Sequence, residues 1–144
     1  MPNTIILRGD QYTRREDKSS EAITPGHLLD FAADDTLIKN ATEGGRSRLF
    51  AVEADYIGNS VTTAYANGDR VPYADCAPGV IVWAHLASGQ NVARGAALMG
   101  DSTVAGALIA HTGTNFQCAE ADEDADATTG VAAAGSKRFR ARVV

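Results

Sequence analysis

Turn-forming residues interrupt the chain about every 8 to 12 residues from Ile23 onward, and this spacing limits the fold more than any other feature. A strand can turn back after a few residues, whereas a helix needs a longer uninterrupted segment. The spacing therefore predicts an all-β sandwich or barrel. The turns fall at Pro25-Gly26, Asp34-Asp35, Gly44-Gly45, Gly58-Asn59, Asn67-Gly68-Asp69, Pro78-Gly79, Ser88-Gly89-Gln90, Gly100-Asp101 and Thr112-Gly113.

The segments between these turns are the expected strands. Residues 80–86 have the highest density of β-branched and aromatic side chains, which predicts a central strand with Trp83 in the core, together with Phe50 and Val82. Pro72 cannot donate to a ladder, so its strand is expected at an edge or at a bend. The expected strands are 27–31, 36–39, 48–55, 69–74, 79–86, 96–99, 106–111, 115–119 and 137–144.

Composition favours one folded domain. The chain has 144 residues, of which 44% are hydrophobic and 22% charged, enough apolar surface for a core. Its net charge of -5 argues against a nucleic-acid partner, which clustered Lys and Arg would recognise. No apolar run is long enough to cross a membrane, and the N-terminus lacks the pattern of a signal peptide, which predicts synthesis without secretion. Cys76 and Cys118 are expected to be buried free thiols.

Charged residues are concentrated in a segment near each end of the chain. Residues 8–21 mix both signs of charge and hold only Tyr12 as a large apolar side chain, which predicts an extended N-terminal arm over residues 1–22, followed by a β domain over 23–144. An acidic, Ala-, Thr- and Gly-rich stretch at about 120–135 is expected to be a loop.

The last strand alternates arginines with apolar residues, the period of a half-buried strand. Because the acidic loop adjoins it, we expect these arginines to pair with that loop in the same or a neighbouring subunit, at an oligomer interface. The three arginines are Arg138, Arg140 and Arg142.

Motifs for catalysis or cofactor binding are incomplete. The glycines of residues 95–102 have the spacing of a phosphate-binding loop, but Asp101 stands where lysine is needed. Ser102 lacks the histidine motif of a hydrolase, and the three histidines lack metal-ligand spacing. We therefore expect no enzyme, no cofactor and no metal.

Residues 89–98 also resemble a turn phrase of lipoyl and biotinyl carrier domains, which carry a cofactor on a lysine at a hairpin tip. The three lysines of this chain, Lys18, Lys39 and Lys137, do not fall in such a hairpin. A small ligand-binding or carrier-like β module is kept as the alternative function.

Several phrases, taken in order, resemble the head decoration (capsid cement) proteins of tailed bacteriophages. The resemblance covers residues 23–110. The phrases are Ile23–Leu29 (ITPGHLL), Leu49–Glu53 (LFAVE), Tyr65–Val71 (YANGDRV), Ala77–Val80 (APGV) and Leu86–Leu98 (LASGQNVARGAAL).

This resemblance implies a compact β-barrel or β-tulip-like domain, usually a homotrimer. It implies a protein on the outer surface of the virion that clamps neighbouring major capsid subunits and is made in the cytoplasm of the host bacterium. Capsid contacts in the family come from an N-terminal arm and loops. The expected contact residues here are Ile5, Leu7, Arg8, Tyr12, Arg14 and Arg15.

Overall fold

The computed structural model describes residues 2–144, which form thirteen β-strands and one short 3-10 helix. The all-β prediction is confirmed. The elements are β1 (Ile6–Arg8), β2 (Tyr12–Lys18), β3 (Leu28–Phe31), β4 (Leu37–Lys39), β5 (Leu49–Ala51), η1 (Asp55–Ile57), β6 (Arg70–Cys76), β7 (Ile81–Ala87), β8 (Asn91–Val92), β9 (Ala97–Gly100), β10 (Leu108–Ala110), β11 (Ala119–Ala121), β12 (Ala125–Asp126) and β13 (Ser136–Val143).

Five strands close into a barrel, in the order β7, β10, β9, β11, β13 and back to β7. β7 pairs antiparallel with β13 along its whole length. On its other edge β7 pairs with β1 near Val82 and with β10 at Leu86. The segment predicted as the central strand therefore has neighbours on both sides.

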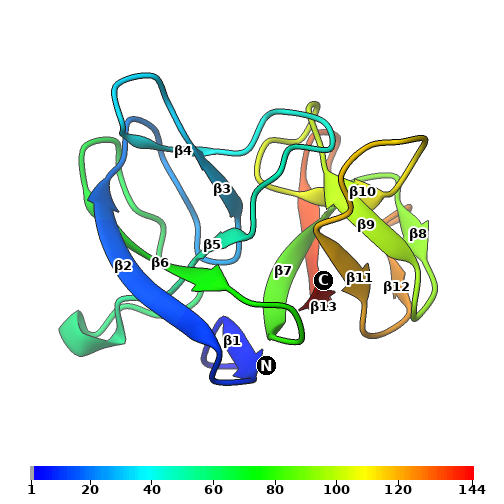
Figure 1. The fold of residues 1–144 in the computed structure, drawn as a ribbon, viewed down its shortest axis with the longest axis horizontal. Coiled ribbons are helices and arrows are strands. Elements are labelled where there is room, and N and C mark those ends of the chain that lie inside the picture. The colour runs from blue at the N-terminus through cyan, green and yellow to red at the C-terminus, as the bar shows by residue number, and fades with distance from the viewer. Residues whose placement is uncertain (1) are drawn as a thin grey trace.

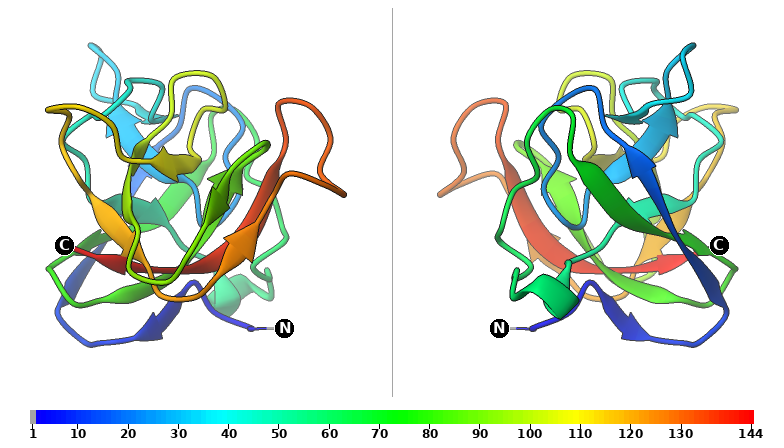
Figure 2. Two further views of the ribbon diagram at one scale, coloured as in Figure 1. Left: turned by 90° about the vertical axis from the view of Figure 1, so that its right-hand side faces the viewer. Right: turned by 90° about the vertical axis from the view of Figure 1, so that its left-hand side faces the viewer.

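A second sheet has the order β2, β6, β5, β3, β4. A parallel bridge between Ser19 and Leu37 draws the end of β2 toward β4, so this sheet is curled as well. β8 and β12 form a separate two-stranded pair. Figure 1 shows the second sheet on the left and the barrel on the right, with β6 leading directly into β7, and Figure 2 views the molecule from these two sides.

The core consists of two apolar clusters, of which the larger fills the barrel and extends to Leu28 and Phe50 of the second sheet, and the smaller lies within the second sheet. Phe139, Leu98 and Leu108 are fully buried in the barrel, and Tyr73 and Leu29 are fully buried in the second sheet. Phe50 and Val82 are core residues, as predicted. Trp83 is only half-buried against the barrel cluster, so its predicted core position is wrong. Because side chains alternate along β7, burial of Val82 inside the barrel places Trp83 on the outer face.

The alternation of the last strand is confirmed by β13. Phe139, Ala141 and Val143 are buried, whereas Arg138, Arg140 and Arg142 retain solvent exposure. The barrel therefore takes its inner face from the apolar half of this pattern and offers the arginines on its outer surface.

Pro72 lies in β6, between β2 and β5, so the predicted edge position is wrong. Its carbonyl accepts the backbone N–H of Val52, just beyond the end of β5. The N–H that proline lacks would have pointed to the same side, toward the Val52 carbonyl. That carbonyl instead accepts the Tyr65 hydroxyl at 2.7 Å. A side-chain donor therefore replaces the missing backbone donor inside the sheet.

The N-terminal segment is extended but lies against the domain. β2 pairs with β6 from Tyr12 opposite Cys76 to Lys18 opposite Arg70. β1 pairs with β7, and Ile5 has no exposed surface. Main-chain hydrogen bonds thus hold a segment whose charged side chains contribute little to a core.

Candidate functional site

The connection between β1 and β2 opens a groove on the molecular surface. β1 pairs with the barrel strand β7, whereas β2 pairs with β6 of the second sheet. The two strands therefore diverge after a tight turn at Gly9. Gly9 has a φ of +98°, and a Cβ there would lie 3.3 Å from the Cα of Val80. This turn therefore requires glycine.

The groove has a volume of about 420 Å³ and brings together residues that are distant in sequence. Four of the six predicted contact residues line it, namely Leu7, Arg8, Tyr12 and Arg14. The remaining lining residues are Thr4, Ile6, Gly9, Val52, Glu53 and Asp55.

The other two predicted contact residues lie elsewhere. Arg15 is on the opposite face of β2, where its guanidinium lies 5.6 Å from the centre of the Tyr73 ring. Ile5 is fully buried in the barrel cluster and donates its N–H to Glu53. A side chain without exposed surface cannot contact a partner in this conformation, so Ile5 is a core residue here.

Two acidic residues between the end of β5 and the start of η1, Glu53 and Asp55, form the other wall of the groove. Glu53 is 6% exposed, and its Oε2 accepts the Ile5 N–H at 2.9 Å. The Arg14 guanidinium donates to the Glu53 carbonyl at 3.1 Å and lies 4.0 Å from the Asp55 carboxylate. The groove is therefore lined by two arginines and two carboxylates. Arg14 and Glu53 are both fixed by hydrogen bonds to the backbone of this chain.

The exposed large apolar side chains of residues 2–144 lie at or beside β2. They are Tyr12, Tyr56 and Ile57, which are 38%, 64% and 65% exposed. Tyr56 in η1 donates its hydroxyl to Glu16 at 2.6 Å, and the Arg14 guanidinium lies 5.7 Å from its ring centre. Exposed aromatic residues grouped with arginine are typical of protein–protein interfaces.

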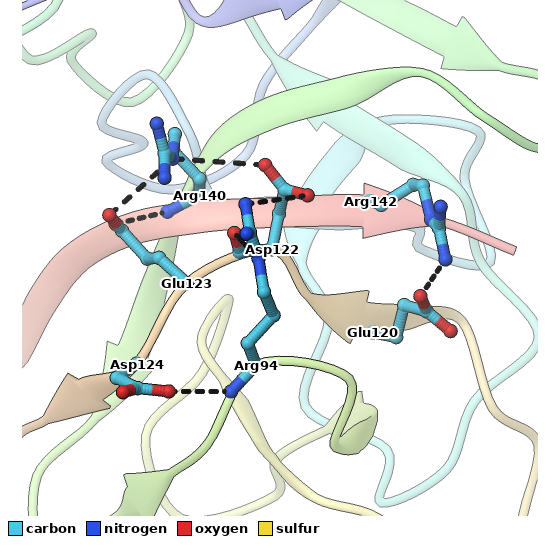
Figure 3. A network of polar contacts seen from close by, with 7 residues as sticks. All are labelled: Arg94, Glu120, Asp122, Glu123, Asp124, Arg140 and Arg142. Carbon is cyan, nitrogen blue, oxygen red and sulfur yellow. Dashed lines mark hydrogen bonds and ion pairs between the residues drawn. The ribbon is translucent and has the colours of Figure 1, made fainter.

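The acidic segment and the arginines of β13 pair within one chain (Figure 3). Arg140 Nε lies 3.4 Å from Glu123 and 3.8 Å from Asp122, and Arg142 contacts Glu120. Arg94 joins the same network through Asp122 and Asp124. Exposed ion pairs of this kind contribute little individually, so their main effect is to hold the acidic segment against the barrel.

Arg138 differs from its two neighbours in the pattern. Its guanidinium donates to the carbonyl of Trp83 on the neighbouring strand β7 and to the carbonyl of Val61, in the connection between η1 and β6. Pairing with the acidic segment is thus confirmed for Arg140 and Arg142 and wrong for Arg138. The oligomer interface at these three arginines stays a prediction.

Two histidines stack against each other. The ring centres of His27 and His85 are 4.4 Å apart. His27 Nδ1 accepts the Thr24 N–H at 3.0 Å, and His85 contacts the Pro25 carbonyl at 3.1 Å and Ser136 at 2.8 Å. Burial, together with positive neighbours, lowers the pKa of His27 to about 3 and that of His85 to about 4. Both rings are therefore neutral at pH 7.

Because the pKa values of His27 and His85 are lowered in the folded state, we expect the protein to lose stability in mild acid. The unfolded chain binds protons at both histidines below about pH 6.5, whereas the folded chain binds them only near pH 3 to 4, so protons favour unfolding. The free energy of unfolding should fall by roughly 3 to 5 kcal/mol from pH 7 to pH 4.5. Urea titrations would measure this, and the His27→Gln/His85→Gln protein should show a flatter curve. An equal pH dependence in both proteins would contradict the assignment.

The motif residues Asp101 and Ser102 lie in a turn, and both cysteines are buried. The Asp101 carboxylate accepts the N–H groups of Thr103 and Val104, so Ser102 lies within a turn that this side chain closes. Cys76 and Cys118 are buried free thiols, as predicted, and burial raises their pKa values to about 12 and about 11.

Within residues 2–144 no three His, Cys, Asp or Glu side chains are grouped to hold a metal ion. That part of the chain also has no helix of the length and apolarity needed to span a membrane.

The fold is similar to that of a solved phage protein, the head fiber gp8.5 N base of bacteriophage phi29. The TM-score is 0.60 at 12% sequence identity, and the match covers 93% of this chain and 95% of the other. No protein-family model matches the chain, and no curated protein matches its sequence. At this identity the likeness shows a shared fold over almost the full length of both chains.

Proposed function

We propose that this chain is a structural protein of a phage head, which binds the outer surface of the mature capsid and clamps neighbouring major capsid subunits. One observation carries the proposal: the fold matches the N base of a head fiber over 93% of this chain and 95% of that one. The match includes both sheets, because neither alone could account for that coverage.

The sequence supports the same conclusion independently. Phrases such as Ala77–Val80 and Leu86–Leu98 resemble head decoration proteins in their amino-acid sequence. In the structure Pro78-Gly79 and Ser88-Gly89 lie in turns that flank β7. Sequence phrases and fold therefore both lead to proteins of phage heads, although they are separate kinds of similarity.

The groove between β1 and β2 is the proposed capsid contact. It gathers Leu7, Arg8, Tyr12 and Arg14 on one surface, beside the exposed side chains of η1. In a homotrimer three such surfaces would engage one shell, and their combined retention would exceed that of a single contact through effective concentration. Binding to the mature shell alone would stabilise that state by mass action.

Binding to heads tests the proposal. Purified protein should co-sediment saturably with expanded heads of the phage that encodes it, and only weakly with unexpanded heads. The N-terminal segment should be tested by point substitutions, because its removal would take Ile5 from the core and β2 from its sheet. Absence of binding to either form of head would contradict the proposal and favour the ligand-binding alternative.

A further inference from the structure

The outer edge of β2 is an open sheet edge. Within residues 2–144, β2 ends the second sheet and pairs only with β6 until Ser19 bridges to Leu37 (Figure 1). On the β6 side, the Gln11 carbonyl accepts the N–H of Ala77, and Ser19 donates its N–H to the Asp69 carbonyl. Since backbone direction alternates along a strand, the odd-numbered residues face β6 and the even-numbered ones face outward.

The outward backbone groups between residues 12 and 16 are therefore available to another strand. Among them, the carbonyl of Glu16 receives only a long contact of 3.4 Å from the Arg70 guanidinium. All five side chains from Tyr12 to Glu16 are exposed. A long exposed edge strand can pair with a strand of another chain. This edge is therefore a candidate site for such pairing.

Apart from Arg15 at its centre, the charge pattern of β2 is complementary to itself in one antiparallel register. In an antiparallel pair of two β2 strands centred on Arg15, Arg14 of each copy lies opposite Glu16 of the other, and Thr13 lies opposite Asp17. Sliding the pair by one hydrogen-bonding step places Arg14 opposite Arg14 in one direction and Glu16 opposite Glu16 in the other. Like charges directly opposite one another destabilise a sheet, whereas opposite charges stabilise it.

We infer that β2 pairs with β2 of a second copy of this chain, antiparallel and centred on Arg15, about a two-fold axis. The Arg15 side chains face each other there, and each is balanced by Asp17 of the partner on the diagonal and drawn over its own Tyr73 ring. In a three-fold assembly on a capsid, the same contact would join neighbouring trimers. The inference does not depend on capsid binding.

Cysteine cross-linking tests both the contact and its register. Residues opposite each other in a non-hydrogen-bonded antiparallel pair have Cα atoms about 4.5 Å apart, which a disulfide can span. The Arg15→Cys protein should therefore form covalent dimers with itself under mild oxidation. Thr13→Cys, two residues away on the same face, is the matched control: alone it should not dimerise, but mixed with Asp17→Cys it should. The native thiols are buried and should not interfere.

Charge variants separate specific pairing from chance collision. Glu16→Arg in the Arg15→Cys background should lower the yield of covalent dimer about tenfold, and the exchange Arg14→Glu/Glu16→Arg should restore it. Equal cross-linking of the Arg15→Cys and Thr13→Cys proteins would overturn the inference. So would the absence of covalent dimers of the Arg15→Cys protein at millimolar concentration. Efficient linking of Thr13→Cys with Arg15→Cys would show the register that places Arg14 opposite Arg14, and would also overturn it.

Discussion

Replacing Phe139 by alanine is expected to lower the free energy of unfolding by about 3 to 5 kcal/mol. Phe139 is fully buried and lies on β13, opposite Ala84 of the central strand β7. Its neighbours in the register, Ala84 and Ala141, are small, so they cannot fill the cavity that the ring would leave. The midpoint of thermal unfolding should fall by roughly 10 °C.

An exposed aromatic residue supplies the control for this substitution. Tyr56→Ala removes a side chain of similar size that is 64% exposed, and it should change stability by less than about 1 kcal/mol. Chemical denaturation of both proteins, followed by the fluorescence of Trp83, would give the two values. Equal small losses in the two proteins would mean that burial of Phe139 inside the barrel does not stabilise the fold.

Reversing both arginines of the groove is expected to have the largest effect on function. The Arg8→Glu/Arg14→Glu protein should bind expanded heads about a hundredfold more weakly than the unaltered protein, because charged groups at an interface become repulsive when reversed. Both side chains are exposed, so the folded state should survive. Circular dichroism and the unfolding midpoint would verify this, and quantitative co-sedimentation would measure binding.

The matched control is a second charge reversal of the same size. Arg46 and Lys137 are exposed and do not line the groove, so Arg46→Glu/Lys137→Glu changes the net charge equally. It should bind heads within about threefold of the unaltered protein if the groove is the contact. Equal weakening by the two pairs would point to net charge instead, and undiminished binding by both would exclude the groove.

Most barrel strands could be predicted because their information is local. The exception is β11, because a strand was predicted at 115–119 and a loop at about 120–135, whereas β11 covers Ala119–Ala121 and β12 also lies in that stretch. Turn residues bound β7 and β9, and the alternation from Lys137 to Val144 identifies β13. β1 and β2 could not be predicted in this way. β2 reads YTRREDK and is held by main-chain pairing to β6, which side-chain polarity does not report.

The site was predictable only in part, for the same reason. Of the six contact residues predicted in the N-terminal segment, four line one groove, whereas Ile5 and Arg15 do not. Glu53, Asp55 and Tyr56 were missed because tertiary structure brings them beside that segment. A single acidic residue within the apolar run from Phe50 to Ala54 was the available signal for Glu53.

We propose that this protein lies on the outside of the mature shell and bridges capsid subunits. A cryo-electron microscopy reconstruction of expanded heads, with and without added protein, would locate it. The proposal predicts additional density outside the shell, each copy contacting at least two capsid subunits, with the groove between β1 and β2 facing the shell. Density confined to the inside of the head or to the tail, or no additional density at saturating protein, would contradict it.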